Sequence, residues 1–347
     1  MKLKCNFAGK KKKRMKKNLC VILFAVFSTT TFAQTIEIKT EDFKMTVKPI
    51  VTIFSNFGTG IGQGADNNSG FNLDRVYLGA SFNLTESLSG RVRLDIGNPE
   101  VSGSKLERVA YVKNAELNWK TGNFTLNGGL INTIQSDVQE KQWGYRYILK
   151  SFQDEYIFGS SADMGISAQY NFTDWLYVDG IFRNGEGYKE LNKDDKFCYG
   201  GGVTLQPIKP LTVRVYYDRY DKKPADTSVA KSRENLALFL GYKQKEFSFG
   251  AECNNLFNSK FTENSTLRGL SAYATVKLPK DLEVFGRWDY LYSQNDWNIA
   301  KDGQLGVVGL QYSPCKYVKL SPNFRAWQPA EGGEAKMSAF LNLQVAL

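Results

Sequence analysis

Residues 336–347 read Lys336-Met-Ser-Ala-Phe-Leu-Asn-Leu-Gln-Val-Ala-Leu347, and apolar side chains occupy nearly every second position. A period of two residues is typical of a β-strand with one apolar and one polar face, because successive side chains point to opposite sides. The stretch therefore predicts such a strand. Its apolar face would carry Met337, Ala339, Leu341, Leu343, Val345 and Leu347, opposite Lys336, Ser338, Asn342 and Gln344.

The same alternation recurs along the chain, for example in residues 197–206 and 236–242, and we find no helix-period segment of useful length. The chain is therefore predicted to be all-β, with about 16 strands. The predicted strands are 43–57, 71–84, 87–97, 109–120, 122–131, 160–171, 175–184, 197–207, 211–220, 235–244, 246–254, 267–278, 281–291, 303–313, 316–326 and 336–347.

The connections between these strands alternate between long and short. A soluble β-sandwich has no reason to place every second turn at one end and make it tight. A transmembrane antiparallel β-barrel has an even strand count, short periplasmic turns and long extracellular loops, and it satisfies every backbone group in lipid. This pattern predicts such a barrel. Its long loops are 58–70, 98–108, 132–159, 185–196, 221–234, 255–266, 292–302 and 327–335.

The first 33 residues have the pattern of a cleavable signal peptide. A basic segment, residues 1–17, precedes the apolar stretch 19–27, and Thr31-Phe-Ala33 resembles a cleavage site. We therefore predict a signal peptide at 1–33 and a barrel at 34–347, with export through this cleavable signal to the outer membrane of a Gram-negative cell. The alternative is a short buried helix behind a basic tail.

Most of the net positive charge of the chain lies in residues 1–33. The chain holds 45 Lys and Arg against 35 Asp and Glu, a net charge of +10, and nine of the basic residues lie within 1–33. The remainder has 36 basic and 35 acidic residues, or +1. The run Lys10–Lys17 therefore fits a targeting segment, and no nucleic-acid partner is expected.

Composition also excludes classes of activity. The chain contains no His, which removes the usual catalytic triads, imidazole bases and His metal sites. No apolar run approaches the ~18 residues of a membrane-spanning helix. We expect no enzyme activity, no cofactor and no metal.

The apolar faces of the strands predict a lipid-facing outer band, so outer-membrane lipid is an expected partner. Aromatic residues near strand ends would form the interfacial girdles. The band would include Val76, Leu78, Ala80, Phe82, Leu84, Val92, Leu94 and Ile96, and the girdles Trp119, Phe172, Trp175, Tyr242, Trp288, Tyr290 and Tyr312.

Several segments resemble an outer-membrane porin, specifically the Bacteroidota branch of the phosphate-selective porin O/P-like family. They are Phe71–Gly79, Arg91–Gly97, Tyr111–Trp119, Gly144–Tyr147, Ser161–Gly165 and Asn184–Tyr188. The resemblance implies a sixteen-stranded barrel, a homotrimer, and passive diffusion of small hydrophilic solutes. It also implies that a long loop after the fifth strand folds inward and narrows the pore, and the longest connection, 132–159, has that position.

Pore selectivity depends on the width and the lining charges. Charges in mid-strand should face the lumen, because Arg or Lys on the lipid face costs about 2–4 kcal/mol. The inward set would be Arg75, Arg91, Arg93, Arg183, Arg214, Arg287, Lys319 and Arg325, with Asp95, Glu116, Asp179, Asp218, Glu252, Glu283 and Asp289. The candidate constriction loop adds Asp137, Glu140, Lys141, Arg146, Lys150, Asp154 and Glu155.

One hypothesis makes Arg75, Arg91 and Arg93 a basic wall that faces the acids of the loop, with a transverse field between them. The alternative is that these groups are solvated ion pairs in the lumen. The expected function is passive diffusion of small hydrophilic solutes and ions, anions such as phosphate possible among them. The mixed charge of the loop differs from the ladder of Arg and Lys that phosphate selection would favour. A plugged barrel with a structural or adhesive role is the alternative function.

Overall fold

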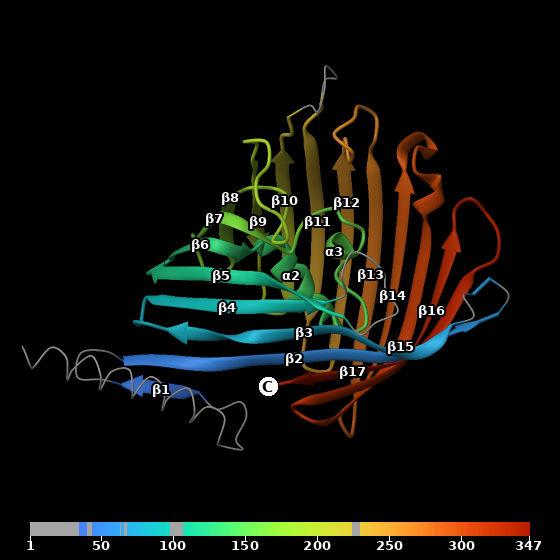
Figure 1. Cartoon of the computed structure of the whole chain (residues 1–347), viewed down its shortest axis with the longest axis horizontal. Helices are drawn as coiled ribbons and strands as arrows, with labels where there is room; N and C mark the ends of the chain where they lie inside the picture. The colour runs from blue at the N-terminus through green and yellow to red at the C-terminus, as the bar shows by residue number, and fades with distance from the viewer. Residues whose placement is uncertain (1–34, 40–43, 63, 66–67, 98–106, 224–229) are drawn as a thin grey trace, which may run out of the picture.

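A computed structural model of the chain describes residues 35–39, 44–62, 64–65, 68–97, 107–223 and 230–347. Within this part, sixteen antiparallel strands, β2 to β17, each pair with the next, and β17 pairs with β2. The sheet is thus closed into a barrel, as the sequence predicts (Figure 1). The signal peptide predicted at 1–33 lies outside the described residues.

The strand bounds agree with the predicted ranges to within a few residues at most ends. They are β2 Lys44–Ile61, β3 Ser69–Asn83, β4 Leu88–Gly97, β5 Val109–Thr121, β6 Phe124–Asn132, β7 Ala162–Asn171, β8 Leu176–Arg183, β9 Cys198–Leu205, β10 Leu211–Tyr220, β11 Arg233–Lys243, β12 Phe247–Phe257, β13 Leu267–Leu278, β14 Leu282–Ser293, β15 Gly303–Cys315, β16 Val318–Pro329 and β17 Lys336–Ala346.

Two strand features were not predicted. A short strand, β1 (Ile36–Lys39), pairs with the first residues of β2. In addition, β2 extends four residues past its predicted end at 57, because Gly58–Ile61 pair with Met337–Phe340 of β17. The extension belongs to the strand pair that closes the barrel.

The connections alternate in length as predicted. Turns such as 84–87, 122–123, 244–246 and 316–317 are short, and we refer to their side as the short-turn end. The longest connection, between β6 and β7, carries two helices, α2 (Ile134–Trp143) and α3 (Phe152–Glu155). Two 3-10 turns, η1 (Gln294–Asp296) and η2 (Ile299–Lys301), lie between β14 and β15.

Helix α2 is a finding that hydropathy could not predict. Its buried residues are Gln135, Ser136, Gln139, Gln142 and Trp143, so its packed face is mostly polar. The helix ends at Gly144, whose φ of 77° is left-handed backbone that favours glycine. No helix in the described part of the chain is long and apolar enough to span a membrane.

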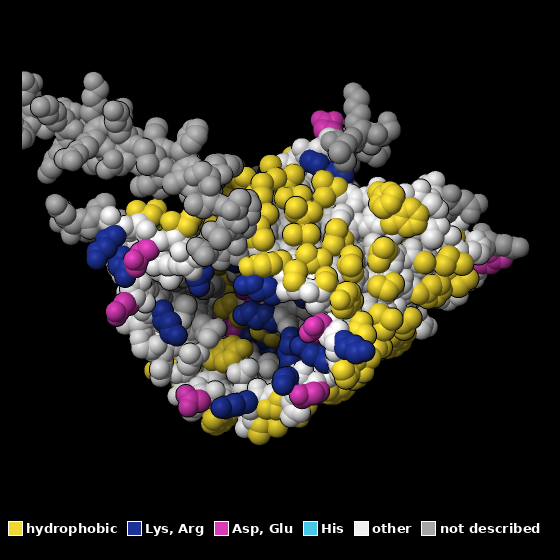
Figure 2. Space-filling view, turned by 90° about the horizontal axis from the view of Figure 1, so that it is seen from below, with side chains coloured by type: hydrophobic (Ala, Val, Ile, Leu, Met, Phe, Trp, Pro, Cys, Tyr) yellow, Lys and Arg dark blue, Asp and Glu magenta, His cyan; other side chains and the backbone are white. Residues whose placement is uncertain are grey.

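The predicted apolar band lies on the outside of the barrel. Val76 pairs across strands with Ile96, and Leu78 with Leu94. Large hydrophobic side chains, Leu78 and Val92 among them, are exposed, and Figure 2 shows hydrophobic side chains over much of the outer surface. Trp119, Phe172, Trp175 and Tyr312 are also exposed at or next to strand ends, whereas Trp288, which was predicted for a girdle, is exposed in the middle of β14.

Candidate functional site in the barrel lumen

The β6–β7 connection, residues 133–161, lies within the barrel and contacts strands far away in the sequence (Figure 1). Gln139 Nε2 of α2 donates to Glu252 of β12 at 2.6 Å. Tyr145 Oη donates to Glu283 of β14 at 2.6 Å. Asn342 Nδ2 of β17 donates to the carbonyl of Tyr147 at 3.0 Å. We call this segment the inner loop.

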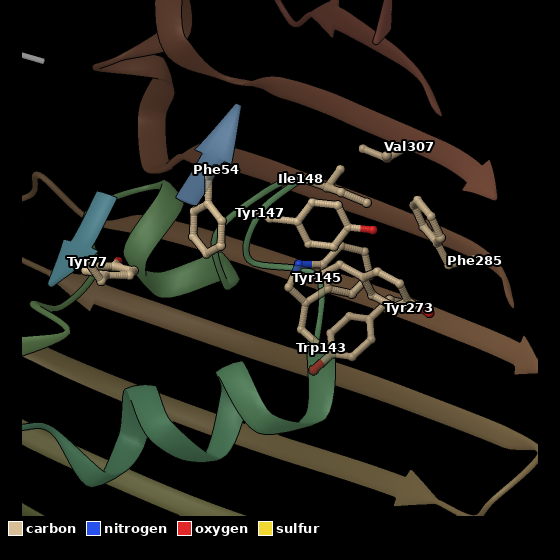
Figure 3. Packing of buried hydrophobic residues seen from close by; sticks show 9 residues of the cluster. All are labelled: Phe54, Tyr77, Trp143, Tyr145, Tyr147, Ile148, Tyr273, Phe285 and Val307. Atoms are coloured by element: carbon tan, nitrogen blue, oxygen red, sulfur yellow. The ribbon is translucent and has the colours of Figure 1, made fainter. Parts of the chain in front are cut away.

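Aromatic packing anchors the inner loop to one side of the barrel (Figure 3). Tyr145 stacks on Phe285 of β14 with ring centroids 4.5 Å apart, and Trp143 meets Tyr273 of β13 edge-on at 5.2 Å. Trp143 and Phe285 are almost fully buried. Such pairs stabilise contacts by about 0.5–1.5 kcal/mol beyond the burial of their surface.

A second apolar cluster anchors the other end of the loop. Phe152 and Phe158 pack against Leu256, Leu267 and Leu291 of β12, β13 and β14. Both clusters lie inside a barrel whose predicted lining was polar. The loop therefore contacts several strands through both polar and apolar groups.

Three of the predicted inward arginines form buried ion pairs. Arg214 binds Asp179 through both carboxylate oxygens, at 2.5 and 2.9 Å, and its Nε donates to Gln135 of α2 at 2.9 Å. Arg183 lies 3.2 Å from Asp218, and Arg287 lies 2.7 Å from Asp289. All three arginines have side chains at most 2% exposed.

Arg287 also connects the wall to the loop. Its Nη1 donates to the carbonyl of Lys150 at 2.6 Å, and its guanidinium lies over the Trp143 ring, 5.0 Å from the centroid. Removing one partner from a buried ion pair typically costs about 3–5 kcal/mol, because the other charge is left without compensation. We therefore regard these groups as parts of a rigid wall.

The arginines of the predicted basic wall lie on β3 and β4 and are partly exposed. Arg75 contacts Asp95 at 3.2 Å, and Arg91 contacts Glu116 at 2.5 Å. Arg93 lies over the Tyr77 ring at 4.9 Å. Two of the three positive charges are thus neutralised by acids of the same wall, on β4 and β5.

The acids of the loop differ from the predicted arrangement as well. Glu140 and Asp154 both pair with Arg146 of the same loop, the latter at 2.7 Å. Asp137 accepts a hydrogen bond from Asn132 at 2.8 Å. Direct ion pairs between these carboxylates and the wall arginines are absent from the described residues, since Arg146 is the nearer partner.

Arg146 joins the loop to the β3 wall. Its Nε donates to Tyr77 Oη at 3.2 Å, and Arg75 donates to the same oxygen at 3.1 Å. Burial raises the pKa of Asp154, but the charges of Arg146, Lys113 and Lys150 outweigh it and hold this pKa below its usual value. Asp154 therefore stays charged beside Arg146.

Lys113 belongs to this group but was missed from the sequence. Its ammonium donates to Ser161 Oγ at 3.1 Å and lies 4.9 Å from the centre of the Tyr188 ring. A register shift in the β4–β5 pairing makes Lys113 and Asn114 both face inward. The apolar outward residues Val112 and Ala115 are three apart at this point, and that break in the period of two is the signal of the bulge.

The remaining predicted loop residues are spread along the segment. Lys141 is exposed near the end of α2, and its carbonyl accepts a hydrogen bond from Lys243 Nζ at 2.6 Å. Lys150 contacts Arg287 through its carbonyl, as described above. Glu155 ends α3 and is half-buried.

Helix α2 lies between two cavities that face the short-turn end. A cavity of about 350 Å³ on one side is lined by residues of β3–β6 together with Ile134 and Asp137 of the helix. A cavity of about 430 Å³ on the other side is lined by Val138 and Lys141, and by residues of β8–β11 and their turns. We call the first cavity, beside β3–β6, the amide chamber and the second, beside β8–β11, the lysine chamber.

The lysine chamber is basic. Lys141, Lys209 and Lys243 line it, and the described lining contains no acid. A neighbouring cavity of about 170 Å³ adds Lys277 and Lys319, with Glu283 as its acid. Figure 2 shows Lys and Arg side chains gathered in and around a hollow of the surface.

In the ranges that the structure describes, no three His, Cys, Asp or Glu side chains are grouped so that they could hold a metal ion.

Comparison with known proteins places the fold among outer-membrane barrels. No protein-family model and no curated protein matches the chain. Among solved structures, OmpF of Salmonella typhi, solved in complex with daunomycin, is similar with a TM-score of 0.67 and 12% identity over 90% of this chain and 100% of that one. The outer membrane channel DcaP of Acinetobacter baumannii has a TM-score of 0.65 and 13% identity, with 89% and 99% covered. The anion-selective porin of Comamonas acidovorans has a TM-score of 0.64 and 13% identity, with 87% and 100% covered. At such identities the likeness concerns the fold.

Proposed function

We propose that the protein is an outer-membrane porin, a water-filled channel for passive diffusion of small hydrophilic solutes and ions. The observation that carries this proposal is the combination of a closed barrel, an apolar exterior and a lumen lined by charged and amide side chains. An apolar exterior suits lipid, and a charged interior needs water. The porin-like folds of the similar solved structures support the same reading.

The inner loop is the proposed constriction. It contacts the walls through Gln139, Tyr145, Arg146 and Tyr147, and cavities of about 350 and 430 Å³ are left on the two sides of α2. The predicted pore-lining residues of β3, β4 and the loop would set the potential beside this narrowing.

We further propose a preference for anions, phosphate among them, at the short-turn mouth. The lysine chamber supports it, because Lys141, Lys209 and Lys243 have no acid beside them in the described lining. The mixed charges on β3–β5 do not add to this preference for anions, since Asp95 and Glu116 neutralise two of the arginines there. A preference for phosphate, as in the phosphate-selective O/P-like family, would therefore depend on Lys141, Lys209 and Lys243.

The export signal at 1–33 and a homotrimeric assembly complete the proposal. The first rests on the basic and apolar segments of the leader, and the second on the resemblance to porins. Absence of enzyme activity rests on the absence of His from the chain.

A plugged barrel with a structural or adhesive role is the second candidate, and one observation favours it. Inward side chains on many strands are almost fully covered, for example Asp95, Asp179, Asn254, Arg287 and Asn342. Such coverage would follow if the inner loop left no continuous path for ions.

Single-channel recording of the purified protein in a planar bilayer separates the two candidates. A porin would insert in discrete steps of ohmic conductance, and reversal potentials in gradients of chloride, phosphate and sulfate would measure its anion preference. Folded, inserted protein that passes no current at any voltage would contradict the porin and support the plugged barrel.

A further inference from the structure

The amide chamber has a chemistry unlike that of the lysine chamber. It reaches from Asn83 and Ser89, beside the 84–87 turn, to Asn132 and Asp137 beside helix α2. Its volume of about 350 Å³ falls near the lower end of the range for small-molecule sites, about 300–1,000 Å³. The chamber is thus large enough for a small solute.

The charges of the chamber disfavour an anion. Its described lining contains one cation, Arg91, and two acids, Glu116 and Asp137. Arg91 is already paired with Glu116 at 2.5 Å, so the second acid gives the lining an excess of negative charge. An anionic solute would meet this excess, whereas a neutral solute would not.

The remaining lining offers both donors and acceptors. Amide side chains of Asn83, Asn118, Asn127 and Asn132 face the chamber together with hydroxyls of Ser81 and Ser89. Asn127 Nδ2 and Asn132 Nδ2 are held by Ser167 and Asp137, at 3.0 and 2.8 Å, which fixes the direction of both amides. The carbonyl oxygens of such amides accept, and their NH₂ groups donate.

Two buried polar atoms of the lining have no hydrogen-bond partner among the described residues. They are Asn118 Oδ1, an acceptor, and Arg91 Nε, a donor. A buried polar atom without a partner is destabilising by about 1–3 kcal/mol. The side chains that carry these atoms line the chamber, so a small rotation of either side chain would present its atom to a solute. A hydroxyl group can donate to the first atom or accept from the second, and a molecule with several hydroxyl groups can do both.

We propose that the amide chamber is a binding site for a neutral polyhydroxylated solute, a mono- or disaccharide. This inference rests on the proposed function, since the solute enters through the channel. Hydroxyl groups of the sugar bind Asn118 and Arg91, and the carboxylate of Asp137 accepts from further hydroxyls. Helix α2 separates this solute from anions, which are drawn to the lysine chamber on its other side.

The test measures the conductance of the full-length protein in planar bilayers while sucrose is titrated, with each current corrected for the conductivity of the bulk solution. Wild-type channels should show a saturable decrease in corrected conductance. Asn118→Leu removes the acceptor and should raise the half-saturating sucrose concentration by about fivefold, as expected for one lost hydrogen bond.

Matched variants make the result specific. Gln206→Leu changes an amide of the lysine chamber and should leave the sucrose response as in wild type. Asn118→Asp keeps the size and the acceptor oxygens and should retain most of the response, so it checks that Asn118→Leu acts through the hydrogen bond. Heat-modifiable migration on gels shows whether each variant is folded.

Three results would overturn the inference. They are a sucrose effect fully explained by bulk conductivity, equal sucrose sensitivity in Asn118→Leu and wild type, or an Asn118-dependent block by phosphate in place of sucrose. A conducting channel without sucrose binding would leave the proposed porin function intact. A folded protein without any conductance would contradict the porin function itself.

Discussion

The two sides of the lumen differ in how deeply their paired arginine side chains are buried. On the β8–β14 side, Arg183, Arg214 and Arg287 are at most 2% exposed and each is paired with an aspartate. On the β3–β5 side, Arg75 and Arg91 keep 22% and 24% of their side chains exposed, although both are also paired. Similar residues therefore have two kinds of environment within one barrel.

The inner loop is the reason for this difference. Its aromatic residues pack on β13–β15, and its polar groups cover the arginines of that side. Toward β3–β6, the loop leaves the amide chamber. We infer that the β8–β14 side holds the loop in place. Under the proposed porin function, solutes would pass beside the β3–β6 side and the lysine chamber.

Replacement of the inner loop by a tight turn should give the largest effect, a change in single-channel conductance. Asn132 and Ala162 are paired at the ends of β6 and β7, so a two-residue Asn-Gly turn can replace residues 133–161. We expect single-channel conductance to rise by about threefold or more, because the lumen is then free of its inward segment. As a control, a tight turn in place of residues 258–265 shortens an outer connection and should leave conductance close to wild type. An unchanged conductance after loop replacement would show that the loop does not narrow the path.

The next effect concerns the buried ion pairs. Arg214→Ala leaves Asp179 buried without its partner and should lower the free energy of unfolding by about 3–5 kcal/mol. Arg219→Ala removes pairs with Asp221 and Glu234 whose side chains are 32–40% exposed, and should cost about 0–1 kcal/mol. Guanidinium unfolding of both variants in detergent measures the difference. Equal losses would contradict the distinction between buried and exposed pairs.

Charge reversal in the lysine chamber should change selectivity without large loss of stability. The triple substitution Lys141→Glu, Lys209→Glu and Lys243→Glu places acids on exposed positions at the short-turn mouth. We expect the anion-to-cation permeability ratio to fall by about twofold or more in low salt, where screening is weakest. Lys301→Glu, in the β14–β15 connection, is the control at the opposite end. The reversal potential in a salt gradient gives the result, and equal shifts in both variants would argue against a local effect.

Arg91→Gln should give the smallest change. The substitution removes one charge and leaves Glu116 without its ion pair, so cations should be favoured by less than about twofold. Reversing both Arg91 and Arg93 to Glu should enlarge this shift in the same direction. A reversal potential that stays unchanged in the double variant would show that the β4 wall has no part in selectivity.

The fold could be predicted nearly strand by strand, because alternation and connection length are local properties of the sequence. The inward positions of Arg214 and Asp179 follow from the same alternation. Their pairing does not, since it depends on which residues of β8 and β10 are neighbours in the barrel.

The contacts that anchor the inner loop could not be predicted from the sequence for a different reason. Phe285 and Tyr273 face inward against the rule that barrel interiors are polar, and only the presence of the loop makes those positions favourable. Lys113 was missed because one extra residue in β5 reverses the alternation. The inward aromatic residues depend on tertiary contacts, and the position of Lys113 depends on a single bulge. A search for a regular period of two residues detects neither.

The seam between β2 and β17 has a consequence for the rate of folding. All other neighbouring strands among β2–β17 are consecutive in the chain, whereas Thr52–Ile61 pair with Met337–Ala346. Bringing together ends separated by nearly three hundred residues costs about 5 kcal/mol of chain entropy on the logarithmic law for loop closure. Local hairpins should therefore form early and the seam late. Substitutions at the seam should then mainly speed unfolding, whereas equally destabilising ones inside an early hairpin should mainly slow folding.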